Sequence, residues 1–416
     1  MRIVRPICCG LDVHKSVVVA TIASTGADGV TSHEQRSFST LNPDLAHLRD
    51  WLVERGCPEV CMESTGKYWM PVFNALEGHV RVVVTHPKYV RAIKGKKTDK
   101  KDSKWIADLF ACDLVRTSFI PPRDIRECRE IARYRHKLVC MRSSERNRYQ
   151  NCMTVSNIGL GSVLSDCMGV TARAIMADIA SGEPFDEGRV RSLIRGRAKA
   201  RADLVVDAVR GCNVDGAQRF KIAAATEHMD HLDELIAACE AELRERLAPH
   251  WAAVELAQTI PGVRELSAML IISEVGDDMS VFDDADHLAS WAGLAPGCNE
   301  SAGKKRSSRT TRAGRYLKPV LIQCALAAVR SGDDGYFAAK YERISRRRGK
   351  KRALVAVARM MMVSLYHMLS NGEVFNPSDH DSPARAREDC KALTEQSALD
   401  LLRALGYDIS APAPVG

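Results

Sequence analysis

The amino-terminal part of the chain alternates short apolar runs with segments of helical periodicity, and this alternation constrains the fold more than any other feature. The runs predict strands over Ile7 to Val13, Val17 to Ala23, Glu34 to Thr40, Glu59 to Glu63 and Val80 to Thr85. Helices are predicted over Leu45 to Arg55 and Tyr68 to Leu76, and from near Pro87 and Asp99. Strands interleaved with helices predict an α/β unit that ends near Leu114.

Helical periodicity replaces the strand pattern after Pro121-Pro122 and continues to about Trp251. An apolar stripe at three- and four-residue spacing comprises Met229, Leu232, Ile236, Cys239, Leu243 and Leu247. It fits a helix packed in a bundle, or an antiparallel coiled coil that pairs subunits. We predict an α/β domain over 1–120, a helical or coiled-coil region over 121–255, a mostly helical domain over 256–372 and a peripheral tail over 373–416.

The net charge of +8 is too small to identify a polyanion-binding protein unless the cations are clustered. They gather in three runs, Lys88 to Lys104, Lys304 to Lys318 and Arg343 to Arg352, and the second run contains no acid. Such runs are either solvated faces or phosphate contacts, and three of them favour nucleic acid. The candidate contacts are Lys94, Lys96, Lys97, Lys304, Lys305, Arg306, Arg309, Arg312 and Arg315.

Neither a membrane span nor a signal peptide is expected, because no stretch approaches about 18 apolar residues and the amino terminus runs straight into strand-like sequence. The 14 cysteines are scattered without a Cys-x-x-Cys pair, which predicts reduced core thiols. Both features predict a cytoplasmic protein.

Four carboxylates stand where predicted strands end and a predicted helix begins. Asp12 and Glu63 end two strands, while Asp99 and Asp102 lie three residues apart on one face of a helix start. Four converging carboxylates repel one another unless divalent cations hold them, so the pattern predicts a magnesium site. Two such ions can stabilise both the attacking and the leaving oxygen of a phosphodiester.

Each carboxylate also has an ordinary structural interpretation. Asp12 could form a turn, Asp99 could cap a helix, Asp102 could complement the helix dipole, and Glu63 could be an exposed charge. Together, two strand ends followed by a helix start favour the metal site.

Three segments around these acids resemble the acidic motifs of the DEDD transposases of the IS110 ("IS one-ten") insertion-sequence family. They are Gly10-Leu11-Asp12-Val13-His14-Lys15, Met62-Glu63-Ser64-Thr65-Gly66-Lys67-Tyr68 and Lys97-Thr98-Asp99-Lys100-Lys101-Asp102-Ser103. The resemblance continues through Thr259-Ile260-Pro261-Gly262-Val263, Trp291-Ala292-Gly293-Leu294-Ala295-Pro296 and Glu300-Ser301. It therefore covers the chain from about residue 7 to residue 370.

The resemblance implies a RuvC/RNase-H-like amino-terminal domain, a coiled-coil middle and a carboxy-terminal transposase domain. It implies that Asp12, Glu63, Asp99 and Asp102 bind Mg²⁺, and that Ser301 attacks a DNA phosphate. It further implies a guide RNA, DNA ends and target as partners, and a homo-oligomer, dimer or tetramer, in which another subunit supplies the metal site. The chain departs from the family at Arg264, where a glycine is usual, and at Ala302, which splits the family's Ser-Gly.

The residues alone leave alternatives open. Ser301 has rival hydroxyls in Ser307, Ser308, Thr310 and Thr311, and no histidine lies next to it in the sequence to act as a base. Gly262 fits either a plain interhelical turn or a phosphate-binding turn. We expect a transposase that cuts and rejoins DNA; the alternatives are a RuvC-like nuclease in which water attacks, and a non-catalytic nucleic-acid-binding protein.

Overall fold

The computed structural model describes residues 2–64, 66–87, 99–297, 299–301, 304–307, 309–311, 313–330 and 335–377. For residues 99, 100, 299–301 and 304–307 it describes the backbone but not the side chains. The chain divides into two compact units, Met1–Ile120 and Pro121–Gly416.

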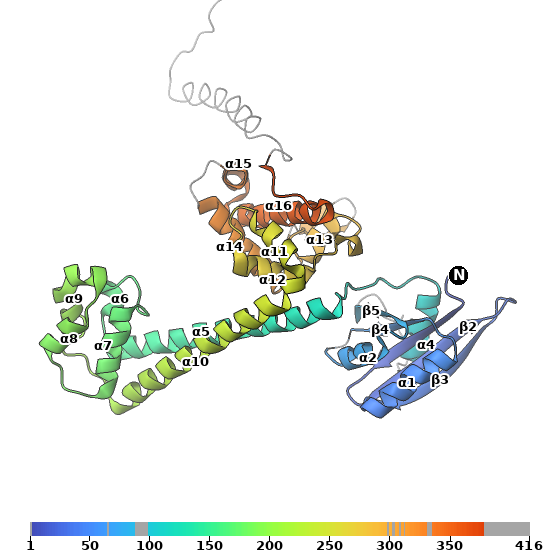
Figure 1. The fold of residues 1–416 in the computed structure, drawn as a ribbon, viewed down its shortest axis with the longest axis horizontal. Coiled ribbons are helices and arrows are strands. Elements are labelled where there is room, and N and C mark those ends of the chain that lie inside the picture. The colour runs from blue at the N-terminus through green and yellow to red at the C-terminus, as the bar shows by residue number, and fades with distance from the viewer. Residues whose placement is uncertain are drawn as a thin grey trace, which may run out of the picture. The chain divides into compact units, whose positions relative to one another are not determined.

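A five-stranded sheet with the order β3-β2-β1-β4-β5 forms the centre of the first unit (Figure 1). The strands are β1 (Ile7–Val13), β2 (Val17–Thr25), β3 (Thr31–Ser39), β4 (Glu59–Glu63) and β5 (Arg81–Thr85). β1, β2 and β3 are antiparallel neighbours, whereas β4 runs parallel to β1, and β5 runs parallel to β4. The predicted α/β class is confirmed, and each predicted strand is present with shifts of a few residues at its ends.

Helices pack on both faces of this sheet. Cys9 and Leu11 of β1 belong to one core cluster with residues of α1 (Asn42–Glu54) and α2 (Trp69–Leu76). Cys8 of β1 and Cys61 of β4 point to the opposite face, where they pack with α4 (Asp99–Ala111). Alternate residues of a strand face opposite sides, so this division assigns every side chain of β1 and β4 to a face. The helix predicted near Pro87 falls largely outside the described residues.

The cysteines of the described residues are free thiols, but the prediction that they lie in the core was wrong for some of them, since Cys140 is exposed and Cys112, Cys167, Cys212 and Cys239 are partly buried. Burial raises the pKa of the Cys8 thiol and of the Cys61 thiol to about 12. These thiols are therefore protonated core side chains at neutral pH.

An antiparallel pair of long helices, α5 (Arg123–Val155) and α10 (Gly216–Arg246), begins the second unit. Ion pairs along its length set the register: Glu127 with Arg246, Glu240 with Arg135, Asp233 with Arg142 and Glu145 with His228. Leu232 and Ile236 of the apolar stripe pack against Leu138 of α5. The stripe thus forms contacts within the chain, and its use in pairing subunits stays a prediction.

A helical cap, residues 156–215, joins the two long helices. It contains α6 (Leu160–Val163), α7 (Val170–Ser181), α8 (Glu187–Leu193), a 3-10 turn (Gly196–Arg201) and α9 (Ala202–Asp207). Its core includes Ile175 and Val206, which cluster with Tyr149 of α5 and Ile222 of α10.

The carboxy-terminal part of the second unit is mostly helical, as predicted. After a 3-10 turn (Ala248–His250) come α11 (Trp251–Gln258), α12 (Glu265–Val275), a 3-10 turn (Met279–Val281), α13 (Ala285–Trp291), α14 (Leu317–Arg330), α15 (Tyr336–Arg348) and α16 (Lys350–Asn371). Between α13 and α14 lies a two-stranded hairpin, β6 (Asn299–Ser301) and β7 (Lys304–Ser307), which was not predicted. Most of the predicted tail lies outside the described residues.

Within the described part of the chain, α16 is the one helix long and apolar enough to cross a membrane by length and composition. The expectation that no segment would approach a span was therefore wrong for α16. Val357, Met361 and Leu365 of this helix are buried, and the helix packs on α13, α14 and α15. A core helix of a folded domain has the same length and composition, so α16 gives no indication of a membrane.

Candidate active site

Asp12 and Glu63 lie at the same edge and on the same face of the sheet. Leu11 of β1 pairs with Met62 of β4 in parallel register, so the next residues along, Asp12 and Glu63, are neighbours. Each follows a cysteine of the α4 face by an even number of residues, Asp12 after Cys8 and Glu63 after Cys61. The carboxyl ends of β1 and β4 therefore present both carboxylates toward the α4 side.

The first turn of α4 lies toward the same edge. The Cys8 Sγ contacts the Ala107 carbonyl at 3.6 Å, and the Val4 amide donates to the Ala111 carbonyl at 2.8 Å. Residues later in α4 thus lie beside residues earlier in β1, so the helix runs antiparallel to the strand. Asp102 is in the first turn of α4 and is partly exposed, and Asp99 begins the helix. The side chain of Asp99 is outside the described residues.

Gly10 allows α4 to pack directly on β1. A Cβ at Gly10 would lie 2.3 Å from the Ser103 carbonyl oxygen and 2.4 Å from the Ala107 nitrogen. Ser103 is also fixed from the other side, because its Oγ lies 2.8 Å from Thr21 Oγ1. The Gln35 amide donates to both hydroxyls, at 2.7 Å to Thr21 and 3.1 Å to Ser103. The buried Thr21–Ser103 contact and the partly buried bonds from Gln35 position the residue that follows Asp102.

Sequence reasoning did not identify this role of Gly10, Ser103, Thr21 and Gln35. A signal existed, because a glycine inside an apolar strand often marks close approach of another backbone. Nothing in the sequence indicated that the approaching backbone would be α4.

Asp12 is mostly buried, with a side chain that is 13% exposed, and its Oδ2 lies 3.2 Å from His14 Nε2. Carboxylate oxygens are the ligands that Mg²⁺ prefers, so the donor set of Asp12, Glu63 and Asp102 fits such an ion. Over the described side chains, which omit that of Asp99, no group of three or more acids, histidines or cysteines is arranged to hold a metal. The four-carboxylate site therefore stays a prediction.

Ser301 is the last residue of β6, at the end of the hairpin opposite its base. At the base, Pro296 bridges to Thr310, and the Gly297 amide donates to the Arg309 carbonyl at 2.9 Å. In the hairpin itself Ser301 pairs with Lys304. Of the rival hydroxyls, Thr310 accepts a 2.5 Å hydrogen bond from Lys318 Nζ, Ser307 pairs with Asn299 near the base, and Ser308 is outside the described residues.

Two glycines cross where the chain enters and leaves this hairpin. Gly293 has a φ of +71° and Gly314 a φ of +66°. A Cβ at Gly293 would lie 2.2 Å from the Ala313 carbonyl oxygen, and one at Gly314 would lie 2.0 Å from that of Ala292. Only glycine satisfies both the backbone conformation and the contact. The Trp291 to Pro296 motif is thereby explained as one side of a backbone crossing.

Gly262 has a similar explanation. Its φ is +85°, and a Cβ there would lie 2.4 Å from the Cys324 carbonyl oxygen of α14. Packing of the interhelical turn on α14 thus accounts for this glycine without a phosphate.

The predicted nucleic-acid-binding residues are only partly described. Lys94, Lys96, Lys97 and Arg312 lie outside the described residues. Lys304, Lys305 and Arg306 are on β7, where Lys304 pairs with Ser301 and Lys305 pairs with Glu300. Arg309 and Arg315 are exposed, and the Arg315 guanidinium lies 5.9 Å from the Tyr316 ring. The strand that pairs with Ser301 is therefore cationic.

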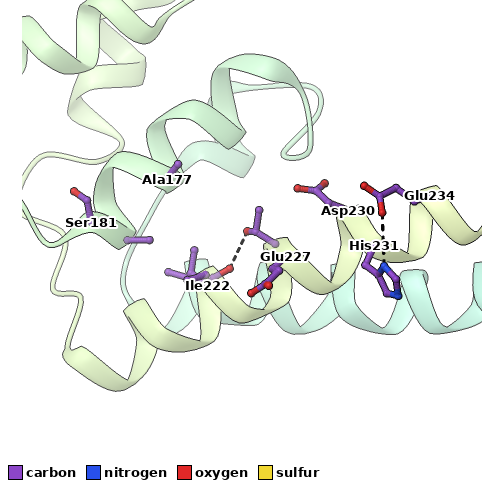
Figure 2. A pocket seen from close by; sticks show the side chains of 10 residues that line it. Ala177, Ser181, Ile222, Glu227, Asp230, His231 and Glu234 are labelled. Carbon is purple, nitrogen blue, oxygen red and sulfur yellow. Dashed lines mark hydrogen bonds and ion pairs between the residues drawn. The ribbon is translucent and has the colours of Figure 1, made fainter.

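A groove of about 760 Å³ between α7 and α10 is a poor alternative site (Figure 2). Three of its lining residues, Glu227, Asp230 and Glu234, are acidic. His231 contacts Glu234 at 3.6 Å, and Asp230 binds Arg173 at 2.6 Å. An acidic lining repels phosphate, so this groove is unsuited to nucleic acid.

Two parts of the chain match models of known protein families. Residues 9–157 match the DEDD model of the IS110 elements, described as a transposase. Residues 254–342 match a model described as the transposase IS116/IS110/IS902 family. The first match contains the carboxylate edge, and the second contains the Ser301 hairpin.

Individual relatives agree with these models. An uncharacterized 42 kDa protein of insertion element IS900 from Mycobacterium paratuberculosis is 30% identical over 200 residues, 46% of this chain and 49% of the relative. An uncharacterized 43.6 kDa protein of insertion element IS110 from Streptomyces coelicolor is 26% identical over 297 residues, 67% of this chain and 72% of the relative. The transposase for insertion sequence element IS1328 of Yersinia enterocolitica is 26% identical over 276 residues, 65% of this chain and 71% of the relative.

The two matched segments define the class of protein, a transposase of insertion-sequence type. The chain belongs to the IS110 family of these transposases, as the sequence motifs predicted. The match spans about half the length of the Mycobacterium relative and nearly three quarters of the Streptomyces one.

Proposed function

We propose that the protein cuts and rejoins DNA with a serine nucleophile, Ser301, and a magnesium site made by Asp12, Glu63, Asp99 and Asp102. The observation that supports the proposal is the shared edge of the sheet, which carries two strand-end carboxylates and toward which the first turn of α4 lies. The family membership supports DNA as the substrate.

The sheet supports a RuvC/RNase-H-like domain. Three antiparallel strands followed by two parallel ones, in the order β3-β2-β1-β4-β5, are typical of that fold. Carboxylates at the carboxyl ends of its central strands suit metal-dependent phosphodiester chemistry. Likeness of fold alone does not define an activity, so the proposal depends on the carboxylates.

In the proposed reaction, Ser301 Oγ forms a bond to phosphorus as the bond from phosphorus to a deoxyribose oxygen breaks. The hydroxyl proton of Ser301 is lost, and the departing deoxyribose oxygen takes up a proton. Bound Mg²⁺ would supply Lewis-acid stabilisation of the charge that develops on the phosphodiester oxygens. The serine ester retains the energy of the phosphodiester, so the reverse reaction can rejoin DNA, whereas attack by water cannot.

The partners are part of this proposal. The cationic β7 beside Ser301 suits contact with the phosphates of DNA ends and target. From the family resemblance we propose in addition a guide RNA, and a homo-oligomer in which the carboxylates of one subunit serve Ser301 of another.

Covalent trapping tests the nucleophile. Wild-type protein incubated with Mg²⁺ and element-end DNA should form an adduct that survives denaturation, and Ser301→Ala should form none. Ser307→Ala is the matched control and should retain the adduct. Cleavage without any adduct in wild-type protein would instead support the nuclease in which water attacks.

Carboxylate variants test the metal site. Asp12→Asn, Glu63→Gln and Asp102→Asn should each reduce cleavage by at least about a hundredfold, as loss of a charge-stabilising group does in other enzymes. Melting temperatures should hold or rise, because each change relieves repulsion between carboxylates. Mixing Ser301→Ala with Asp102→Asn protein should restore part of the cleavage if subunits share sites. Full activity in any single variant removes that residue from the site.

A further inference from the structure

A buried glutamate connects the carboxy-terminal part of the second unit to α5. Glu274, in the last turn of α12, has a side chain that is only 7% exposed. Arg133 of α5 binds both of its carboxylate oxygens, through Nε at 2.7 Å and Nη2 at 2.8 Å. Arg129, one turn earlier, lies 3.5 Å from the same carboxylate and also donates to the Glu274 backbone carbonyl.

Both arginines also contact aromatic rings. The Arg129 guanidinium lies 5.7 Å from the centre of the Trp291 ring, and that of Arg133 lies 4.8 Å from the Tyr316 ring. Guanidinium groups within about 6 Å of such rings are attracted to them, more strongly where water is excluded. The Arg129 side chain is 11% exposed, and burial lowers its pKa to about 10 although Glu274 opposes the fall.

The two rings flank the glycine crossing in the sequence, one on the segment that enters the hairpin and the other on the segment that leaves it. Trp291 lies two residues before Gly293, and Tyr316 lies two residues after Gly314. One arginine therefore contacts the segment that enters the hairpin, and the other contacts the segment that leaves it. Glu274 contacts both arginines: its bidentate contact fixes the guanidinium plane of Arg133, and its carboxylate and backbone carbonyl both face Arg129.

A simpler role for these three residues is to dock the carboxy-terminal helices on α5. An ion pair at any position in that helix contact would contribute to docking. Docking does not explain why both guanidinium groups face rings adjacent to the crossing. Arg135 of α5 offers a comparison, because it binds Glu240 of α10 at 2.6 Å and no ring contact is recorded for it among the described residues.

We infer that Arg129, Arg133 and Glu274 are positioning residues that fix the base of the β6–β7 hairpin and thereby the place of Ser301. The inference rests on the proposed role of Ser301. The three side chains lie on α5 and α12, outside the hairpin, and act on Ser301 through the backbone crossing.

Three variants test the inference. Glu274→Gln keeps the shape but removes the charge, Arg133→Lys keeps the charge but loses the bidentate contact, and Tyr316→Leu removes the ring and leaves the ion pair. Glu240→Gln is the control for the loss of an ion pair on α5. The measurements are the melting temperature, amide hydrogen exchange of residues 296–310, Kd for element-end DNA, and the rate of adduct formation at saturating DNA.

We expect all three variants to slow adduct formation tenfold or more at saturating DNA, with Kd changed less than twofold. Exchange of the Gly297 amide should accelerate in each, because its hydrogen bond to Arg309 closes the hairpin base. Glu240→Gln should leave both measurements unchanged. If the charge variants do not fold, Tyr316→Leu still tests whether these residues position the hairpin, because it keeps the buried ion pair.

Unchanged amide exchange at residues 296–310 in folded variants would overturn the inference. The inference would also be overturned if Glu240→Gln slowed adduct formation as much as the three variants do while lowering the melting temperature equally. Failure of the proposed function has a different signature, since wild-type protein would then form no adduct. The exchange measurement still decides the inference in that case.

Discussion

The carboxylate edge of the first unit and the Ser301 hairpin of the second are held in place by different means. Asp12 and Glu63 lie at the carboxyl ends of strands whose preceding residues are buried on both faces of the sheet. Ser301 ends a strand of three residues, and the base of its hairpin is fixed by the glycine crossing and flanked by the half-buried rings of Trp291 and Tyr316. One group is positioned by a hydrophobic core, and the other by backbone contact and a few polar side chains.

This difference predicts different responses to mutation. A residue held by a core can lose its own functional group without harm to the fold, because the core does not depend on that group. A short hairpin has little core of its own, so changes at its base should alter stability and geometry together. Variants at the glycines of the two regions therefore compare positioning by a hydrophobic core with positioning by backbone contact.

The largest effect is expected from Gly293→Ala. The substitution forces an L-residue into positive φ, which costs about 1–2 kcal/mol. It also drives a Cβ against the Ala313 carbonyl, and overpacking of this kind adds about 1–3 kcal/mol. Denaturant unfolding should report the combined loss. The carboxylate edge should be unaffected, so Mg²⁺ titration should match wild type; an unchanged melting temperature would show that the crossing is not rigid.

Gly10→Ala should have the next largest effect. Gly10 lacks the positive φ of Gly293, so only the contact with Ser103 and Ala107 of α4 opposes the new methyl group, at about 1–3 kcal/mol. Displacement of α4 should move Asp102 and reduce cleavage. Gly216→Ala, at the start of α10, is the control because a Cβ there meets nothing within 4 Å. Cleavage at the wild-type rate would contradict a fixed carboxylate edge.

A smaller effect is expected from replacing Lys304, Lys305 and Arg306 of β7 together by alanine. Each lost phosphate contact should reduce the slope of log affinity against log salt by about 0.9 on duplex DNA. Binding should weaken similarly for unrelated sequences, because phosphate contacts carry little sequence information. An unchanged slope would mean that β7 is only a solvated strand.

The smallest effect concerns His250, whose side chain lies 2.7 Å from Asp277 and 3.0 Å from Asp124. Partial burial alone would lower the pKa of His250, but the hydrogen bonds to Asp277 and Asp124 outweigh it and raise the pKa above its ordinary value of 6.5. The stabilisation is therefore complete below pH 6.5 and is lost as pH rises through the raised pKa.

The measurement is the difference in melting temperature between wild type and His250→Gln, from pH 6 to pH 9. We expect this difference to shrink as the pH rises. A constant difference would show that His250 acts by packing and not by its charge.

The sequence was sufficient to predict the five strands and to place Asp12 and Glu63 at strand ends, but not the order of the strands in the sheet. Apolar runs in the sequence predict strands. Acids at the ends of neighbouring parallel strands lie at one edge of the sheet. The sequence therefore places Asp12 and Glu63 at one edge only if their strands are neighbours, and the structure supplies that condition by pairing β1 with β4. Their shared face required the register between Leu11 and Met62.

The hairpin could not be predicted, for a physical reason. Its strands, Asn299–Ser301 and Lys304–Ser307, are short and charged, with no apolar alternation to mark them. The hairpin is defined by tertiary contacts such as Pro296 with Thr310. The ion pair of Arg133 and Glu274 joins residues 141 positions apart, a separation at which no local pattern operates.

The apolar stripe of α10 illustrates a different limit on prediction from sequence. Leu232 and Ile236 would show the same spacing whether their partner helix lay in the same chain or in another. The choice between the two depends on the cap that reverses the chain direction between α5 and α10.

The fixed register of α5 and α10 has a consequence for how chains of this kind can change length. One inserted residue rotates everything beyond it by about 100° and advances it by about 1.5 Å. An insertion in the middle of α5 would separate Arg142 from Asp233, or Arg135 from Glu240, and no local adjustment restores both. An insertion in the cap, for example between Gly182 and Asp186, leaves the register of α5 and α10 unchanged. Length variation that persists through evolution should therefore accumulate in the cap.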